Sequence, residues 1–148
     1  MPSFPRISPA EAQALVSNNG YIYIDVRSEH EFEAGHPAGA YNVPLMHMAA
    51  GGMSPNPDFV NVILASFGSE ANVIVGCKAG GRSLRAAEAL VAAGFSHVAD
   101  QRAGWSGVRD AFGSVTEAGW SQAGLPTERG QPSGRSYRGL LHATSSTT

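Results

Sequence analysis

The sequence predicts an α/β fold in which a parallel sheet is covered by helices on both faces. Residues 21–26 and 72–76 are mainly apolar, β-branched or aromatic, as is typical of strands buried on both sides. Segments with helical spacing of apolar residues alternate with such runs, and this alternation indicates parallel pairing. The 148 residues, 43% of them hydrophobic, suit a single domain with a real core.

Composition and charge disfavour several classes of protein. Ten Lys and Arg residues against 12 Asp and Glu residues give a formal charge of −2, too near neutral to favour binding of nucleic acid or an acidic membrane surface. No apolar run approaches the roughly 20 residues of a membrane span, and the start of the chain lacks the pattern of a secretory signal. The single cysteine excludes an internal disulfide. We therefore expect a cytoplasmic protein.

The first helix is predicted directly after Ser8. Ser8 can serve as its N-cap, Pro9 occupies the first helical position, and Glu11 completes a capping box. Residues 18–20 (NNG) end this helix. The next predicted elements are a strand at 21–26, a short polar helix at 29–34, a weak strand at 40–43, a Gly- and Pro-containing loop at 49–58 and a helix between 59 and 67.

The clearest unit lies in the second half of the chain. A buried strand at 72–76 leads through a glycine-containing turn at 77–82 into a helix at 83–93. Gly94 ends that helix, and a further short strand is predicted at 95–100. We therefore predict that the turn between this strand and this helix forms the functional site.

That turn contains the single cysteine of the chain. Cys77 stands at the carboxyl end of a parallel strand, the edge at which open α/β sheets form their ligand sites. The loop amides, the helix start and two cationic side chains would each favour the thiolate over the thiol. Gly80 and Gly81 allow the backbone angles that a tight loop around an anion needs. We predict Cys77 as the nucleophile. The residues expected to bind the substrate are Lys78, Ala79, Gly80, Gly81, Arg82 and Ser83.

A structural interpretation of the same residues stays open. On its position alone, a lone cysteine after an apolar strand is most often a small buried core residue. Two glycines before a helix can also form a strand-to-helix turn that has no functional role. The two cations together with the glycines favour a reactive Cys77.

Including this turn, four segments carry motifs, at residues 25–32 (DVRSEHEF), 35–44 (GHPAGAYNVP), 77–82 (CKAGGR) and 120–126 (WSQAGLP). In this order they resemble the motifs of the rhodanese-like family of single-domain sulfurtransferases, over roughly residues 6 to 127. The second segment is similar to the family pattern G-H-x-x-G-A-x-N-x-P, and the third to its C-x-x-G-x-R active loop. The resemblance implies a five-stranded parallel sheet with helices on both faces.

The resemblance also implies a thiosulfate sulfurtransferase. Cys77 would attack the outer sulfur of a donor such as thiosulfate, release sulfite and carry the sulfur as a persulfide. Cyanide in the assay, or a thiol in cells, would then remove it, and a sulfur-accepting protein is a further candidate partner. Lys78 and Arg82 offer positive charge to a doubly negative donor, which favours thiosulfate.

Other polar residues are expected to support the site or the fold. Asp25 and Arg27 would support the active loop by hydrogen bonds, as the resemblance implies, although an Asp and an Arg at a strand end equally often pair with each other. His36, between Gly and Pro, is expected to be a structural turn residue. The histidines show no clustered ligand spacing, so we expect no metal and no cofactor.

The chain departs from the family pattern between Gly104 and Trp120. The extra segment at about 105–119 could form a lid or wall beside the active loop, or a surface excursion. We expect one domain over residues 1–127. Residues 128–148 have few apolar groups and are expected to form a disordered tail.

Three alternative functions compete with sulfur transfer. Cysteine phosphatases with this fold place five residues between cysteine and arginine, whereas four intervene here, so the loop suits one sulfur atom rather than a phosphate. A persulfide carrier or redox sensor that hands sulfur to a partner protein stays an alternative. An inactive interaction module is disfavoured, because both the cysteine and the charged loop are present.

Overall fold

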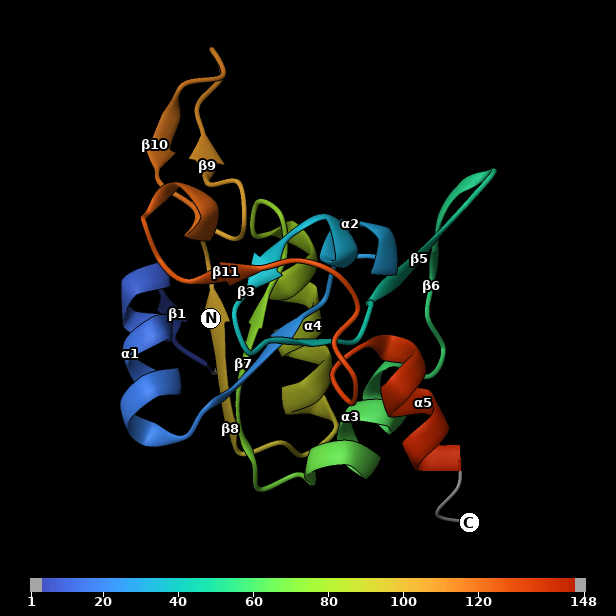
Figure 1. Ribbon diagram of the computed structural model, residues 1–148. Helices are drawn as coiled ribbons and strands as arrows, with labels where there is room; N and C mark the ends of the chain where they lie inside the picture. The colour runs from blue at the N-terminus through green and yellow to red at the C-terminus, as the bar shows by residue number, and fades with distance from the viewer. Residues whose placement is uncertain (1–3, 146–148) are drawn as a thin grey trace.

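The structure is a computed structural model that describes residues 4–145. Its centre is a five-stranded sheet in the order β1-β8-β7-β2-β4 (Figure 1). All neighbouring strands in it are parallel. This sheet confirms the predicted fold class. Its strands are β1 (Arg6–Ile7), β2 (Ile22–Asp25), β4 (Tyr41–Asn42), β7 (Asn72–Gly76) and β8 (His97–Gln101).

The register of the sheet brings the carboxyl ends of its central strands level. Asp25 of β2 lies opposite Gly76 of β7, and Gly76 lies opposite Gln101 of β8. Because the strands are parallel, the segments that follow them all leave at one edge of the sheet. The loop that begins at Cys77 therefore starts between the segments that follow Asp25 and Gln101.

Alternate residues of the strands face two different hydrophobic clusters. Val73 and Val75 join the larger cluster, whereas Ile74 joins the smaller one, as the two-residue period of a strand requires. The larger cluster packs against α3 (Phe59–Phe67), α4 (Gly81–Ala92) and α5 (Tyr137–Ser145), and the smaller one against α1 (Pro9–Asn19), α2 (Glu29–Ala34) and the 3-10 turn η1 (Trp120–Gln122). Figure 1 shows α1 on one side of the sheet and α3, α4 and α5 on the other. Within residues 4–145, none of the helices combines the length and apolarity that crossing a membrane requires.

The first two helices begin with capping boxes. The predicted one is confirmed: the Glu11 N–H donates to Ser8 Oγ at 3.1 Å, and the Ser8 N–H donates to the Glu11 carboxylate at 2.9 Å. Ser28 and Glu31 form the same arrangement at the start of α2. Each box pairs backbone donors that a helix start would otherwise leave free.

Two β-hairpins project from the main body of the molecule (Figure 1). One is formed by β5 (Met46–Ala49) and β6 (Gly52–Pro55), where the sequence predicted only a loop at 49–58. That prediction is wrong for residues 49–55, because the chain pairs across a tight turn that places Met48 opposite Met53. The other is formed by β9 (Val108–Arg109) and β10 (Val115–Glu117), and it makes up most of the extra segment 105–119.

The C-terminal segment differs from the prediction of a disordered tail over 128–148. Within the described residues, β11 (Thr127–Glu128) pairs with β3 (His36–Pro37), and α5 packs against α3. Tyr137 and Leu140 are buried in the larger cluster. These side chains lie one helical turn apart, so even a short apolar stripe suffices to attach α5. Residues 146–148 of the predicted tail lie outside the described residues.

Candidate active site

Cys77 lies on the loop that joins β7 to α4. β7 ends at Gly76 and α4 begins at Gly81, two residues earlier than predicted, with Gly80 as the N-cap. Gly80 has φ 99°, in the left-handed region, and a Cβ placed there would lie 2.5 Å from the carbonyl oxygen of Arg102. Glycine is therefore required at this position both by backbone conformation and by the close approach of another chain segment.

The loop surrounds the sulfur of Cys77 with polar groups on one side. The Gly80 N–H donates to Sγ at 3.1 Å, and the thiol donates to Ser83 Oγ at 3.5 Å. The Ser83 hydroxyl in turn donates to the Gly80 carbonyl oxygen at 3.3 Å. Of the loop amides predicted to face the sulfur, the structure brings the one of Gly80 to it. This N–H and the Ser83 hydroxyl would both stabilise a negative charge on Sγ.

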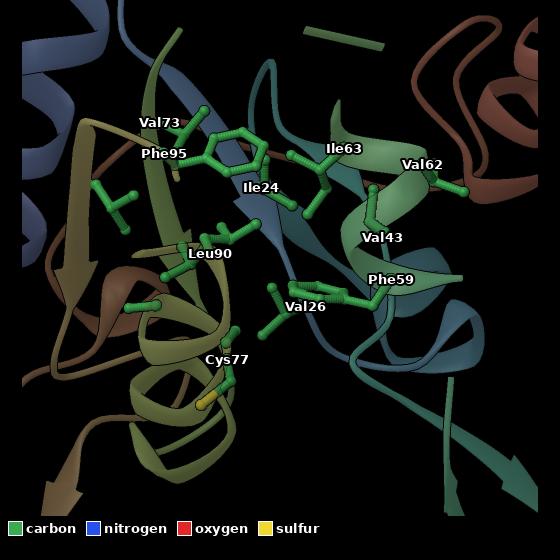
Figure 2. Close-up of a cluster of buried hydrophobic side chains, with 14 of the residues drawn as sticks. Ile24, Val26, Val43, Phe59, Val62, Ile63, Val73, Cys77, Leu90 and Phe95 are labelled. Carbon is green, nitrogen blue, oxygen red and sulfur yellow. The ribbon is translucent and has the colours of Figure 1, made fainter. Parts of the chain in front are cut away.

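The other side of the Cys77 side chain is apolar. Only 3% of Cys77 is exposed, and it belongs to the larger hydrophobic cluster with Val26 and Phe59 (Figure 2). Figure 2 shows its sulfur at the margin of that cluster, beside the first turn of α4. The interpretations of Cys77 as a core residue and as a loop nucleophile thus each describe part of the geometry. The side chain packs at the edge of the core, and its sulfur faces polar groups of the loop.

The segment after β8 braces the outer side of the loop. The Trp105 N–H donates to the Cys77 carbonyl oxygen at 2.8 Å, and the Ser106 N–H donates to the Lys78 carbonyl oxygen at 2.9 Å. Gly104 lies so close that a Cβ there would be 2.5 Å from the Lys78 oxygen. The start of the extra segment is therefore a wall of the active loop. A wall beside the active loop was one of the alternatives predicted for this segment, although the sequence did not indicate which of its residues would contact the loop.

Arg82 forms a bidentate ion pair with Glu31. Its Nη1 and Nη2 donate to the two carboxylate oxygens at 2.7 and 3.0 Å. Burial alone would raise the pKa of Glu31, but the Arg82 hydrogen bonds and charge, together with Ser28, lower it to about 2. Glu31 was not predicted as a site residue, although it stands within the first family motif. The pair joins α2 to the active loop and largely compensates the charge of Arg82.

Lys78 and Ala79 are exposed at the outer face of the loop. Within the part of the chain that the structure describes, the Lys78 ammonium has no hydrogen-bond or ion-pair partner. Lys78 lines a cavity of about 200 Å³ whose other residues are Arg27, Glu31, Ala34, Gly35, Trp105 and Ser106. It also lines a second cavity on the hairpin side of the loop. Lys78 is therefore the loop cation that is free to meet an incoming anion.

Asp25 and Arg27 pair with each other, which was the alternative kept open for them. Arg27 Nη2 lies 2.7 Å from Asp25 Oδ2, and both side chains are buried. Arg27 also donates to the Gly35 carbonyl oxygen at 2.6 Å, and its guanidinium lies 5.1 Å from the centre of the Trp105 ring. Through Trp105 the pair stiffens the wall of the 200 Å³ cavity, so its support of the active loop is indirect.

His36 is buried as part of the framework rather than the active loop. Its ring stacks on Phe32 with centres 3.6 Å apart, and its nitrogens contact the Phe32 carbonyl oxygen at 2.6 Å and the Glu128 carboxylate at 3.0 Å. These contacts fit the structural role predicted from its Gly and Pro neighbours. They also show that the chain beyond residue 127 completes the framework near α2.

The fold and loop define a class of protein. It is an α/β domain with one cysteine, held by a strand-to-helix loop at the carboxyl edge of a parallel sheet. The family model of the rhodanese-like domain matches residues 8–111. The chain belongs to the rhodanese-like family.

Individual relatives agree with this assignment. The chain is 44% identical over 109 residues to thiosulfate sulfurtransferase 16, chloroplastic, of Arabidopsis thaliana, covering 74% of this chain and 81% of that protein. It is 34% identical over 122 residues to thiosulfate sulfurtransferase GlpE of Pseudomonas fluorescens, covering 82% of this chain and all of that protein. The crystal structure of Rv0390 from M. tuberculosis superposes with a TM-score of 0.69 at 28% identity, covering 86% of this chain and 100% of that one.

Proposed function

We propose that the protein is a thiosulfate sulfurtransferase in which Cys77 carries the transferred sulfur as a persulfide. The observation that carries the proposal is the Gly80 N–H, which donates to Cys77 Sγ at 3.1 Å on a loop at the carboxyl edge of the sheet. The names of two relatives, both thiosulfate sulfurtransferases, support the choice of donor.

The first half of the proposed reaction loads the cysteine. The Cys77 thiolate attacks the outer sulfur of thiosulfate, a new S–S bond forms, and the bond between the two donor sulfurs breaks. Sulfite leaves with the electron pair of that bond. The Gly80 N–H stabilises the thiolate before the attack, and the Ser83 hydroxyl can turn to donate to Sγ once the thiol proton has gone. Lys78, as the free loop cation, would attract the doubly negative donor.

The second half returns the cysteine to its first state. Cyanide or a thiolate attacks the outer sulfur of the persulfide, and a bond forms between the acceptor and that sulfur. The S–S bond to Cys77 breaks and its electron pair returns to Sγ as thiolate. The same loop groups stabilise this leaving thiolate, so one site serves both halves without a separate general base.

The geometry supports sulfur transfer better than phosphate chemistry. The position at which a phosphatase arginine would bind the phosphate is taken by Ser83, and the nearby Arg82 is held by both oxygens of Glu31. The low exposure of Cys77 favours attack on a small terminal atom over a tetrahedral group.

The proposal is tested by thiosulfate:cyanide kinetics of the wild type and of Cys77→Ser. The wild type should form thiocyanate with parallel double-reciprocal lines, which indicate that sulfite leaves before cyanide reacts. Cys77→Ser should form none. Activity that survives in this variant would refute the role of Cys77, and hydrolysis of aryl phosphates by the wild type would favour the phosphatase instead.

A further inference from the structure

A cavity of about 360 Å³ separates the active loop from the β9–β10 hairpin. We call it the loop–hairpin cleft, and its lining is Lys78, Ala79, Ser106, Gly107, Val108 and Arg109. Two of these six residues are cationic and none is acidic. By contrast, the other charged residues of the 200 Å³ cavity on the far side of Lys78 are already paired, Arg27 with Asp25 and Glu31 with Arg82. The loop–hairpin cleft is therefore the more positive of the two.

Among the described residues, neither cation of this cleft forms an ion pair with an acidic residue of the hairpin. The Asp110 carboxylate accepts the backbone N–H groups of Phe112 and Ser114, and Glu117 pairs with Arg102 at 2.7 Å. Within residues 4–145, the one hydrogen bond of the Arg109 guanidinium goes to the backbone carbonyl oxygen of Gly113 at 3.1 Å. In a chain with a formal charge of −2, Lys78 and Arg109 thus form a local concentration of positive charge beside the active loop.

The cleft lies beside the reacting sulfur rather than over it. Neither Cys77 nor Gly80, whose N–H contacts the sulfur, is among the residues that line it. A molecule that reacts at Cys77 can place a negative charge in the cleft only if that charge lies several bonds from its reacting sulfur. Thiosulfate carries its charge on the reacting sulfur itself and on oxygens only two bonds from it. A thiol with carboxylates further along its chain has the required shape.

We propose that the loop–hairpin cleft binds the carboxylate of the sulfur acceptor, so that the protein prefers acidic thiols to neutral or cationic ones. This inference rests on the proposed function, because it concerns the acceptor of the same persulfide. Arg109, contributed by the extra segment, would contact the carboxylate at the hairpin side, and Lys78 at the loop side.

The experiment uses the 148-residue chain after it has been loaded with thiosulfate, freed of excess donor and checked by intact mass. The loss of sulfur is then followed in single turnovers with glutathione, with glutathione diethyl ester and with cysteamine. For wild type, glutathione should react with a lower half-saturating concentration than its diethyl ester, which lacks both carboxylates and keeps the ammonium group. Arg109→Gln should reduce the preference for glutathione over the ester about three- to fivefold, the size expected for one exposed ion pair. Arg109→Glu should reduce it further and should improve the reaction of cationic cysteamine.

Arg85→Gln is the matched control, because Arg85 is an exposed arginine of α4 that does not line the cleft. It should keep the wild-type preference. An Arg109→Gln protein with the same preference as wild type would overturn the inference. So would an equal loss in the rate of loading by thiosulfate, since the cleft would then serve the donor. If wild type gains no sulfur from thiosulfate, the proposed function itself fails, and this inference falls with it.

Discussion

The two flanks of the active loop are held in different ways. On the α2 side, Arg82 is bound by both carboxylate oxygens of Glu31, so the charge of Arg82 serves to stabilise the structure. On the hairpin side, the loop is held by backbone hydrogen bonds from Trp105 and Ser106, which leave the Lys78 side chain unpaired among the described residues. The difference shows that of two cations that look equivalent in the sequence, one stabilises the loop and the other is available to ligands.

The largest effect is expected where the hairpin-side flank meets the loop. Gly80→Ala would place a Cβ 2.5 Å from the Arg102 carbonyl oxygen in a left-handed conformation. We expect sulfurtransferase activity to fall below a tenth, with a loss of unfolding free energy of about 1–3 kcal/mol. Thiocyanate assays and urea unfolding measure the two quantities.

Gly81→Ala is the control for that prediction. A Cβ at Gly81 meets nothing within 4 Å, and the residue starts α4 with no left-handed φ. Its stability should be unchanged or higher, because alanine favours helix. Equal destabilisation by the two substitutions would mean that the contact with Arg102 does not hold the loop.

Breaking the ion pair of the α2-side flank should cause the next largest effect, a loss of unfolding free energy. Glu31→Gln removes the charge that faces Arg82, whose side chain is only 12% exposed. We expect a loss of about 1–3 kcal/mol in unfolding free energy, since a partly buried cation loses its partner. Glu33→Gln, on the exposed side of the same helix, should change stability by less than about 0.5 kcal/mol. Equal effects of the two variants would remove the contrast between the flanks.

The same ion pair predicts a pH dependence. The folded protein holds the pKa of Glu31 at about 2, below its ordinary value of 4.5. A lowered carboxyl pKa contributes stability that is fully present above about 4.5 and is lost as the pH falls towards 2. The difference in urea midpoint between wild type and Glu31→Gln should therefore be largest at pH 5 to 7 and shrink as the pH falls to about 2. A difference that stays constant over this range would contradict the ionic origin of the effect.

The smallest effect on stability is expected at the free cation. Lys78→Gln removes a charge that has no partner among the described residues, so its unfolding free energy should lie within about 0.5 kcal/mol of wild type. Its KM for thiosulfate should rise, because the loop loses its uncompensated charge. A stability loss as large as that of Glu31→Gln would show that both flanks use charge in the same way.

Local patterns in the sequence predicted the parts of the fold that depend on neighbouring residues. The strands at 22–25 and 72–76 could be predicted because they are mainly apolar, as is typical of strands buried on both faces. The capping box at Ser8 could be predicted because its two partners are three residues apart. The helix α5 was not predicted, because its short apolar stripe lies among Ser, Thr, Gly and Arg residues and the local pattern is that of a disordered tail.

The missed parts of the site depend on contacts between distant segments. Cys77 and its glycines could be placed from a strand, a turn and a helix start. The partner of Arg82 is Glu31, 51 residues away, and only the folded sheet brings α2 to the loop. The hairpin that supplies Arg109 was visible only as an unexplained insertion. Local pattern does not reveal which of two cations a distant carboxylate will neutralise.

Intact mass spectrometry tests the role of Cys77 most directly. The protein is incubated with thiosulfate, desalted, weighed, and weighed again after cyanide, alongside Cys77→Ser. Wild type should gain the mass of one sulfur atom and lose it to cyanide, while Cys77→Ser keeps its original mass throughout. A wild-type protein that gains no sulfur, or a Cys77→Ser protein that gains one, would contradict the assignment of this cysteine as the sulfur carrier.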